Sequence, residues 1–180
     1  LHHDGYANDL GKRAEEKGKR NMELLREELK EHPNDLRLLL QCVESSTRYK
    51  AEQSEYIHRG MAVLMAGPEK LNPNIAAAFC RYGVRYAMEN RTPEADEWLA
   101  WGEEHFAQSI FFRMDVTLSA ALYYLNQDNY EKALSYGERY IEAYSDFQNG
   151  KYNLGETTVS TLGVCLPEHY SQACQLVAKC

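Results

Sequence analysis

Apolar residues recur at helical spacing along almost the whole of this 180-residue chain, and that spacing limits the folds open to it. Between residues 9 and 31, for example, Met22, Leu25 and Leu29 fall at intervals compatible with one face of a helix. No stretch alternates apolar and polar residues as a half-buried strand would. The 5 prolines all fall between the helical stretches or at the first residue of one. The sequence therefore predicts an all-α fold, in a chain long enough to bury a sizeable core.

Breaks in the helical pattern divide the chain after Pro33 into pairs of helices. The expected pairs cover residues 35–49 with 52–65, 73–89 with 93–106, 112–126 with 129–144, and 156–165 with 167–178. Thr92 is expected to cap the helix that starts at Pro93, and Asp128 with Glu131 has the spacing of a capping box. Antiparallel pairs that repeat every 34–40 residues predict a solenoid, in which each pair buries its apolar face against its neighbours.

One of these pairs carries a regular pattern of large and small residues. Starting at Ala76, the large residues are Phe79, Tyr82, Tyr86 and Leu99, and the small residues are Gly83, Ala95 and Gly102. These positions resemble those of the tetratricopeptide repeat, in which small residues let the two helices of a pair approach closely. A repeat counted from Met114 fits less well because Ala120 and Gly137 are smaller than the template expects, and one counted from Leu36 fits poorly. The resemblance implies a tetratricopeptide-like superhelix over residues 34–180.

Composition argues against several classes of function. A formal net charge of −7 and a pI near 5.4 argue against general nucleic-acid binding, which needs massed Lys and Arg. The longest nearly apolar stretch, Leu118–Leu125, has eight residues, so we expect no membrane span, which needs about 20. The five cysteines form no CxxC pair, which favours a reducing cytoplasm. Because no zinc spacing, phosphate-binding loop or nucleophile elbow appears, we expect no catalytic site and no cofactor in this chain itself.

The first 35 residues carry a second motif. It runs from His3, Asp4, Gly5 and Tyr6 through Lys17, Arg20, Asn21, Leu24, Leu25, Glu28 and Leu29 to Pro33 and Asp35. This order resembles the junction in bacterial family 2 glycosyltransferases between a catalytic domain, which ends in H-x-G-Y, and C-terminal tetratricopeptide repeats. The resemblance implies that residues 1–33 are the tail of a missing glycosyltransferase domain plus a linking helix. The first residue is Leu1 rather than Met, which also leads us to expect a fragment of a longer chain.

The same resemblance implies a chemistry for the parent protein. Such an enzyme transfers a sugar from a nucleotide-sugar donor and uses a divalent metal ion. His3 would be a metal ligand only together with the missing catalytic domain, since a neutral imidazole can join carboxylates and diphosphate oxygens around the ion. Alternatively, His2 and His3 are simply terminal residues or the remnant of a tag.

In tetratricopeptide arrays the first helix of each pair lines a concave groove, so the resemblance also places candidate binding residues. The groove would be lined by Cys80, Val84, Leu118 and Leu122, with Arg81 and Arg85 as a small basic strip on the same helix. A largely apolar groove favours a hydrophobic peptide or helix as the partner, rather than a terminal carboxylate. Alternatively, a short array buries these residues against its own neighbours.

These observations together predict a non-catalytic helical-repeat domain of a glycosyltransferase. Its role would be protein–protein interaction, through recruitment of the acceptor protein or through formation of a homodimer. The alternative is a stand-alone tetratricopeptide-type scaffold with no glycosyltransferase partner.

Overall fold

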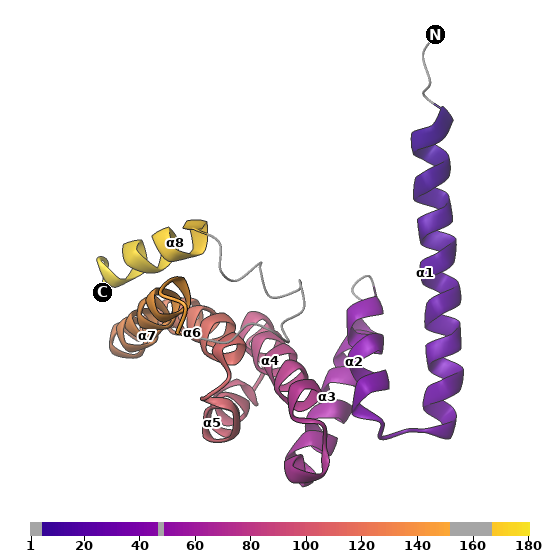
Figure 1. The fold of residues 1–180 in the computed structure, drawn as a ribbon, viewed down its shortest axis with the longest axis horizontal. Helices are drawn as coiled ribbons and strands as arrows, with labels where there is room; N and C mark the ends of the chain where they lie inside the picture. Colours follow the sequence, from indigo (N-terminus) through magenta and orange to yellow (C-terminus); the bar gives the residue numbers. More distant parts are fainter. Residues whose placement is uncertain (1–4, 47–48, 152–166) are drawn as a thin grey trace. The chain divides into compact units, whose positions relative to one another are not determined.

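A computed structural model describes residues 5–46, 49–151 and 167–180, and the side chains of these residues except those of 5–17 and 111. Within these ranges the chain forms α-helices, one short 3₁₀ helix and no strand, so the all-α prediction is confirmed (Figure 1). The elements in chain order are α1 (Gly5–Glu31), α2 (Leu36–Ser45), α3 (Lys50–Ala66), η1 (Pro68–Lys70), α4 (Pro73–Asn90), α5 (Ala95–Phe106), α6 (Ile110–Leu125), α7 (Tyr130–Gln148) and α8 (Pro167–Val177). The expected helix over residues 156–165 lies outside the described residues.

The chain divides into two compact units, Leu1–Phe79 and Cys80–Cys180, and the division falls inside the residue range of α4. The sequence-based boundary between residues 33 and 34 therefore falls inside the first unit. The reason is that α1 runs antiparallel to α2 and packs against it (Figure 1). α1 is therefore part of the first compact unit.

In the first unit, α1, α2 and α3 bury one apolar face each. The core contains Met22, Leu25, Leu29, Leu36, Leu38, Leu39, Cys42, Val43, Tyr56, Ile57, Met61 and Leu64. A half-exposed ion pair joins α1 to α3: Arg26 Nη2 lies 2.7 Å from Glu52 Oε2, and Tyr56 donates a 3.4 Å hydrogen bond to the same oxygen. Asp35 starts α2 as its N-cap, because its carboxylate accepts hydrogen bonds from the backbone N–H groups of Arg37 and Leu38.

In the second unit, small residues mark the places where helices approach most closely. A Cβ atom built on Gly102 would lie 2.6 Å from the ring of Phe112 on α6 and 2.9 Å from Sγ of Cys80 on α4. A Cβ atom on Gly137 of α7 would lie 2.8 Å from Val177 on α8. The small residue at position 137, which fits the tetratricopeptide template poorly, is therefore explained by the close approach of α8.

Two tyrosines tie α6 and α7 to α5. The hydroxyl of Tyr124 donates to Asp96 at 2.5 Å, and the hydroxyl of Tyr136 donates to Glu103 at 3.1 Å. The two rings stack with their centroids 5.5 Å apart. Burial and then Glu103 raise the pKa of Tyr136 to about 12, so its hydroxyl keeps its proton at neutral pH. The side chains of Tyr124 and Tyr136 therefore hold α5, α6 and α7 together.

Both expected helix caps in the second unit are wrong. Thr92 does not cap α5, because a turn through Pro93 places Glu94 directly before the helix, and Thr92 Oγ1 is buried without a hydrogen-bond partner. Asp128 does not cap α7, because its φ of 56° puts it in the left-handed region, one residue before the true cap. That cap is Asn129, whose side chain accepts a hydrogen bond from the backbone N–H of Lys132.

The close approach at Gly102 predicts a large effect of added volume. Gly102→Val should lower the free energy of unfolding by about 1–3 kcal/mol, because the new side chain would collide with the buried ring of Phe112. Gly18→Val on α1 is the control, since no atom lies within 4 Å of the built Cβ, and it should change stability by less than about 0.5 kcal/mol. Urea unfolding followed by circular dichroism measures both. Equal effects of the two variants would contradict the close packing at α5.

Candidate functional site

A groove in the second unit is the candidate site. It is formed by two adjoining hollows of about 420 and 180 Å³ that share Glu89, Ser119 and Leu122. The larger hollow is lined by Arg81, Tyr82, Arg85, Glu89, Asp115, Leu118, Ser119, Leu122, His169 and Gln172. The smaller is lined by Met88, Glu89, Arg91, Ser119, Leu122, Tyr123 and Asn126. These residues come from α4, α6 and α8, apart from Arg91 and Asn126, each the first residue after its helix, and we call the combined hollow the α4–α6–α8 groove.

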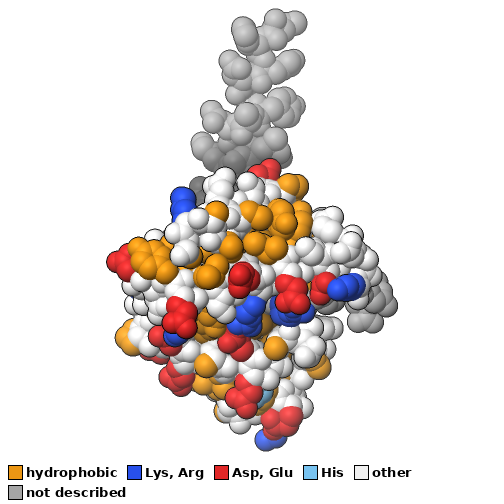
Figure 2. Space-filling model, turned by 90° about the vertical axis from the view of Figure 1, so that its left-hand side faces the viewer, with side chains coloured by type: hydrophobic (Ala, Val, Ile, Leu, Met, Phe, Trp, Pro, Cys, Tyr) orange, Lys and Arg blue, Asp and Glu red, His pale blue; other side chains and the backbone are white. Residues whose placement is uncertain are grey.

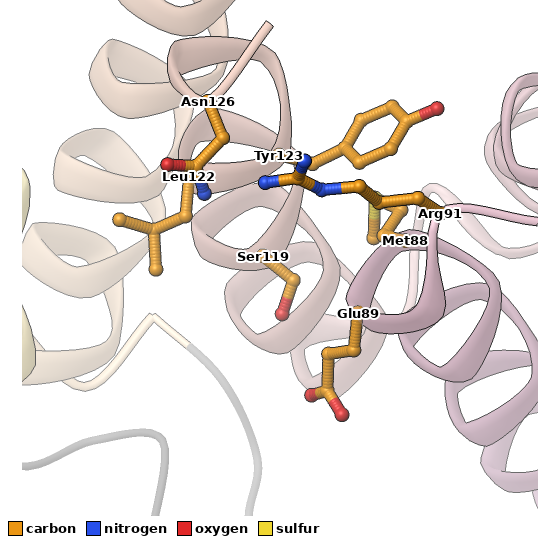
Figure 3. Close-up of a pocket in the computed structure, with 7 residues that line it drawn as sticks. All are labelled: Met88, Glu89, Arg91, Ser119, Leu122, Tyr123 and Asn126. Carbon is orange, nitrogen blue, oxygen red and sulfur yellow. The ribbon is translucent and has the colours of Figure 1, made fainter.

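Helix geometry explains why these side chains meet. Arg81, Arg85 and Glu89 are four residues apart, so they form one stripe along α4. On α6, Ser119 and Leu122 are three residues apart and share a face in the same way. Beyond the end of α4, Arg91 adopts a φ of 53°, and its side chain extends toward α6 near Tyr123 (Figure 3).

A buried carboxylate sits between the two arginines of α4. Asp115, with its side chain 7% exposed, lies on α6 and brings Oδ2 to 3.3 Å from Nε of Arg81 and 3.1 Å from Nη1 of Arg85. Arg85 also reaches Glu89 through Nη2 at 3.0 Å. Burial lowers the pKa of Arg85, but Asp115 and Glu89 outweigh that effect and raise it above the ordinary value. The guanidinium therefore stays charged.

Among the described residues, two nitrogens of the groove lining are buried without a hydrogen-bond partner. They are Nε of Arg85 and Nδ1 of His169. A buried polar atom without a partner carries an uncompensated desolvation cost. The groove therefore has capacity for additional hydrogen bonds.

The structure places the sequence-based candidates in three groups. Arg81, Arg85, Leu118 and Leu122 line the groove. Cys80 and Val84 do not, because both side chains are fully buried, as the alternative of self-burial expects. Burial raises the pKa of the Cys80 thiol far above its usual range, so it stays protonated. His3 lies outside the described residues.

The groove is more polar than the sequence analysis expects. The contributions of Glu89, His169 and Gln172 were not expected. Glu89 continues the four-residue stripe of Arg81 and Arg85, and that spacing could have revealed it. His169 and Gln172 face the groove because α8 contacts both α6 and α7, which no local pattern encodes.

Other kinds of site find no support in the described part of the chain. There, no three His, Cys, Asp or Glu side chains lie close enough together to hold a metal ion. Nor does any helix within the described ranges have the length and apolar character needed to cross a membrane. On the face drawn in Figure 2, acidic and basic side chains are interspersed, with hydrophobic side chains gathered above them.

No protein-family model, curated protein or solved structure matches this chain. We therefore infer function from the groove itself.

The buried carboxylate predicts a measurable contribution to stability. Asp115→Ala should lower the free energy of unfolding by about 2–4 kcal/mol, because it leaves two arginines without their shared partner. Glu142→Ala is the control: Glu142 is 70% exposed and lies 3.9 Å from Arg113, so its loss should cost less than about 1 kcal/mol. Urea unfolding measures both variants. Similar losses would show that Asp115 is not an internal counterion.

Proposed function

We propose that this chain is a helical-repeat domain that binds a peptide segment of another protein in the α4–α6–α8 groove. One observation carries the proposal: three helices separated in sequence by α5 and α7 contribute to one continuous groove. In a tetratricopeptide-like superhelix, α4 and α6 would be the first helices of successive pairs, whereas α8 falls on the second helix expected for the last pair. The chemistry of the lining, apolar leucines beside charged and amide side chains, suits a peptide better than a reaction.

The proposal extends to a glycosyltransferase context. The junction motif between His3 and Asp35 supports a parent enzyme that uses a nucleotide sugar and a divalent metal ion in a domain outside this chain. The groove would then recruit the protein that accepts the sugar, or join two copies of the enzyme. The free thiols of Cys42, Cys80 and Cys174 are in keeping with a reducing cytoplasm. A stand-alone interaction scaffold is the alternative.

Genomic sequence distinguishes the two contexts. If the parent is a glycosyltransferase, the codons upstream of Leu1 should encode alternating strands and helices and an Asp-x-Asp metal motif. A start codon close to Leu1, or an upstream sequence without these features, would favour the stand-alone scaffold. Peptide binding by the groove is tested separately.

Selection from a random library of 12-residue peptides, with the 180-residue chain as bait, tests the groove directly. Selected peptides should bind the unmodified chain and bind Leu122→Ala about 10-fold more weakly, because Leu122 lines both hollows. Fluorescence anisotropy of the labelled peptides measures the affinity. Circular dichroism of each variant establishes that its helices are intact.

Leu24→Ala is the matched control, since the same atoms are removed from a side chain that is 61% exposed on α1 of the first unit. It should leave peptide affinity unchanged. Failure to select any peptide, or equal weakening by both variants, would refute the proposed role of the groove.

A further inference from the structure

The charges that line the α4–α6–α8 groove differ in sign from those of the chain as a whole. Arg81, Arg85 and Arg91 supply three positive charges, and Glu89 and Asp115 supply two negative ones. The chain itself carries a formal net charge of −7. The excess comes from Arg91 in the smaller hollow, since Arg81 and Arg85 in the larger one are matched by Glu89 and Asp115. A net positive groove on an acidic protein favours a negatively charged group over a positively charged one.

Arg81 is held in a conformation suited to a second carboxylate. Its side chain is only 13% exposed, its Nε faces Asp115 at 3.3 Å, and its guanidinium lies 5.5 Å from the centre of the Tyr82 ring. The contact with Asp115 engages one edge of the guanidinium, whose two terminal nitrogens carry four further N–H donors. Because the side chain is already fixed on two sides, little conformational entropy remains to be lost on binding.

Arg85 and the two leucines extend this arrangement along the groove. Among the described residues the buried Nε of Arg85 has no hydrogen-bond partner, and the side chain as a whole is 39% exposed, while its Nη1 and Nη2 contact Asp115 and Glu89. Leu118 and Leu122 lie on the α6 side of the same hollow. An acidic group and an apolar group side by side on one ligand would match both surfaces.

We propose that the groove recognises a peptide segment in which an aspartate or glutamate is adjacent to an apolar residue. The carboxylate would bind Arg81 and Arg85, and the apolar side chain would lie on Leu118 and Leu122. The inference rests on the proposed peptide-binding function and names the chemistry of its partner. It differs from the sequence-based expectation of a hydrophobic peptide, because Asp115 leaves the two arginines able to take a second carboxylate.

The selected 12-residue peptides test this inference through their composition. Asp and Glu should be enriched over the unselected library next to a Leu, Ile, Val or Phe. A synthetic peptide from the pool should bind about 10-fold more tightly than its counterpart with Asn or Gln in place of the acid. Its affinity should also fall as salt rises, since the interaction is between charges.

A mutant cycle then assigns the contact. Arg81→Gln and, independently, the more exposed Arg85→Gln should each reduce the about 10-fold difference between the acidic peptide and its amide counterpart. Arg113→Gln, on the same helix as Leu118 but outside the groove lining, should leave that difference intact. Thermal unfolding measures the stability of each variant. If Arg81→Gln does not fold, Arg85→Gln alone tests the contact.

The outcomes separate this inference from the proposed function. Selected peptides that lack acidic residues, or whose acid preference survives both arginine variants, would overturn the acidic-partner inference but leave peptide binding in place. Failure to select any peptide would overturn both.

Discussion

Close approach of helices at small residues is the constraint on which the second unit depends. At Gly102 the absence of a side chain allows Phe112 of α6 and Cys80 of α4 to pack against the backbone of α5. At Gly137 the same absence admits Val177 of α8. These contacts hold α5 against α4 and α6, and α7 against α8, so packing outside the lining supports the three helices of the groove. Its side chains are therefore presented by a scaffold buried behind them.

Asp115 determines the electrostatic character of that groove. Without a carboxylate between them, Arg81 and Arg85 would place two positive charges at a partly buried position, which is costly in free energy. Asp115 offsets that cost, but through a single oxygen directed at one edge of Arg81 and one terminal nitrogen of Arg85. The same group that stabilises the folded chain thus leaves the arginines with donors for another acceptor.

Local signals in the sequence were enough to predict the described helices, but not how each one is rotated about its own axis. The periodic Met22, Leu25 and Leu29 are all buried, because helical spacing directly reports which face meets the core. The residues that line the groove were harder to predict, since successive helical residues are about 100° apart around the axis. Cys80 and Val84 face the interior, whereas their immediate neighbours Arg81 and Arg85 line the groove.

Contacts between residues far apart in the sequence explain the other features that could not be predicted from it. The smallness of Gly137 makes sense only once α8 lies against α7, and His169 is a groove residue only because α8 also reaches α6. The caps were missed for a more local reason, since the left-handed conformation of Asp128 shifts the start of α7 by one residue. Each of these features depends on backbone geometry rather than on residue type.

The internal carboxylate also bears on selectivity. A ligand carboxylate entering the groove must compete with Asp115 for the same two guanidinium groups, so a single charge yields little affinity unless an apolar contact accompanies it. Leu118 and Leu122 supply that second contact on the adjoining helix. A peptide with only a carboxylate, or only an apolar side chain, would make only one of the two sets of contacts that the groove offers. Under this proposal, discrimination comes from requiring both groups at the spacing between the arginines of α4 and the leucines of α6, two helices that Asp115 joins.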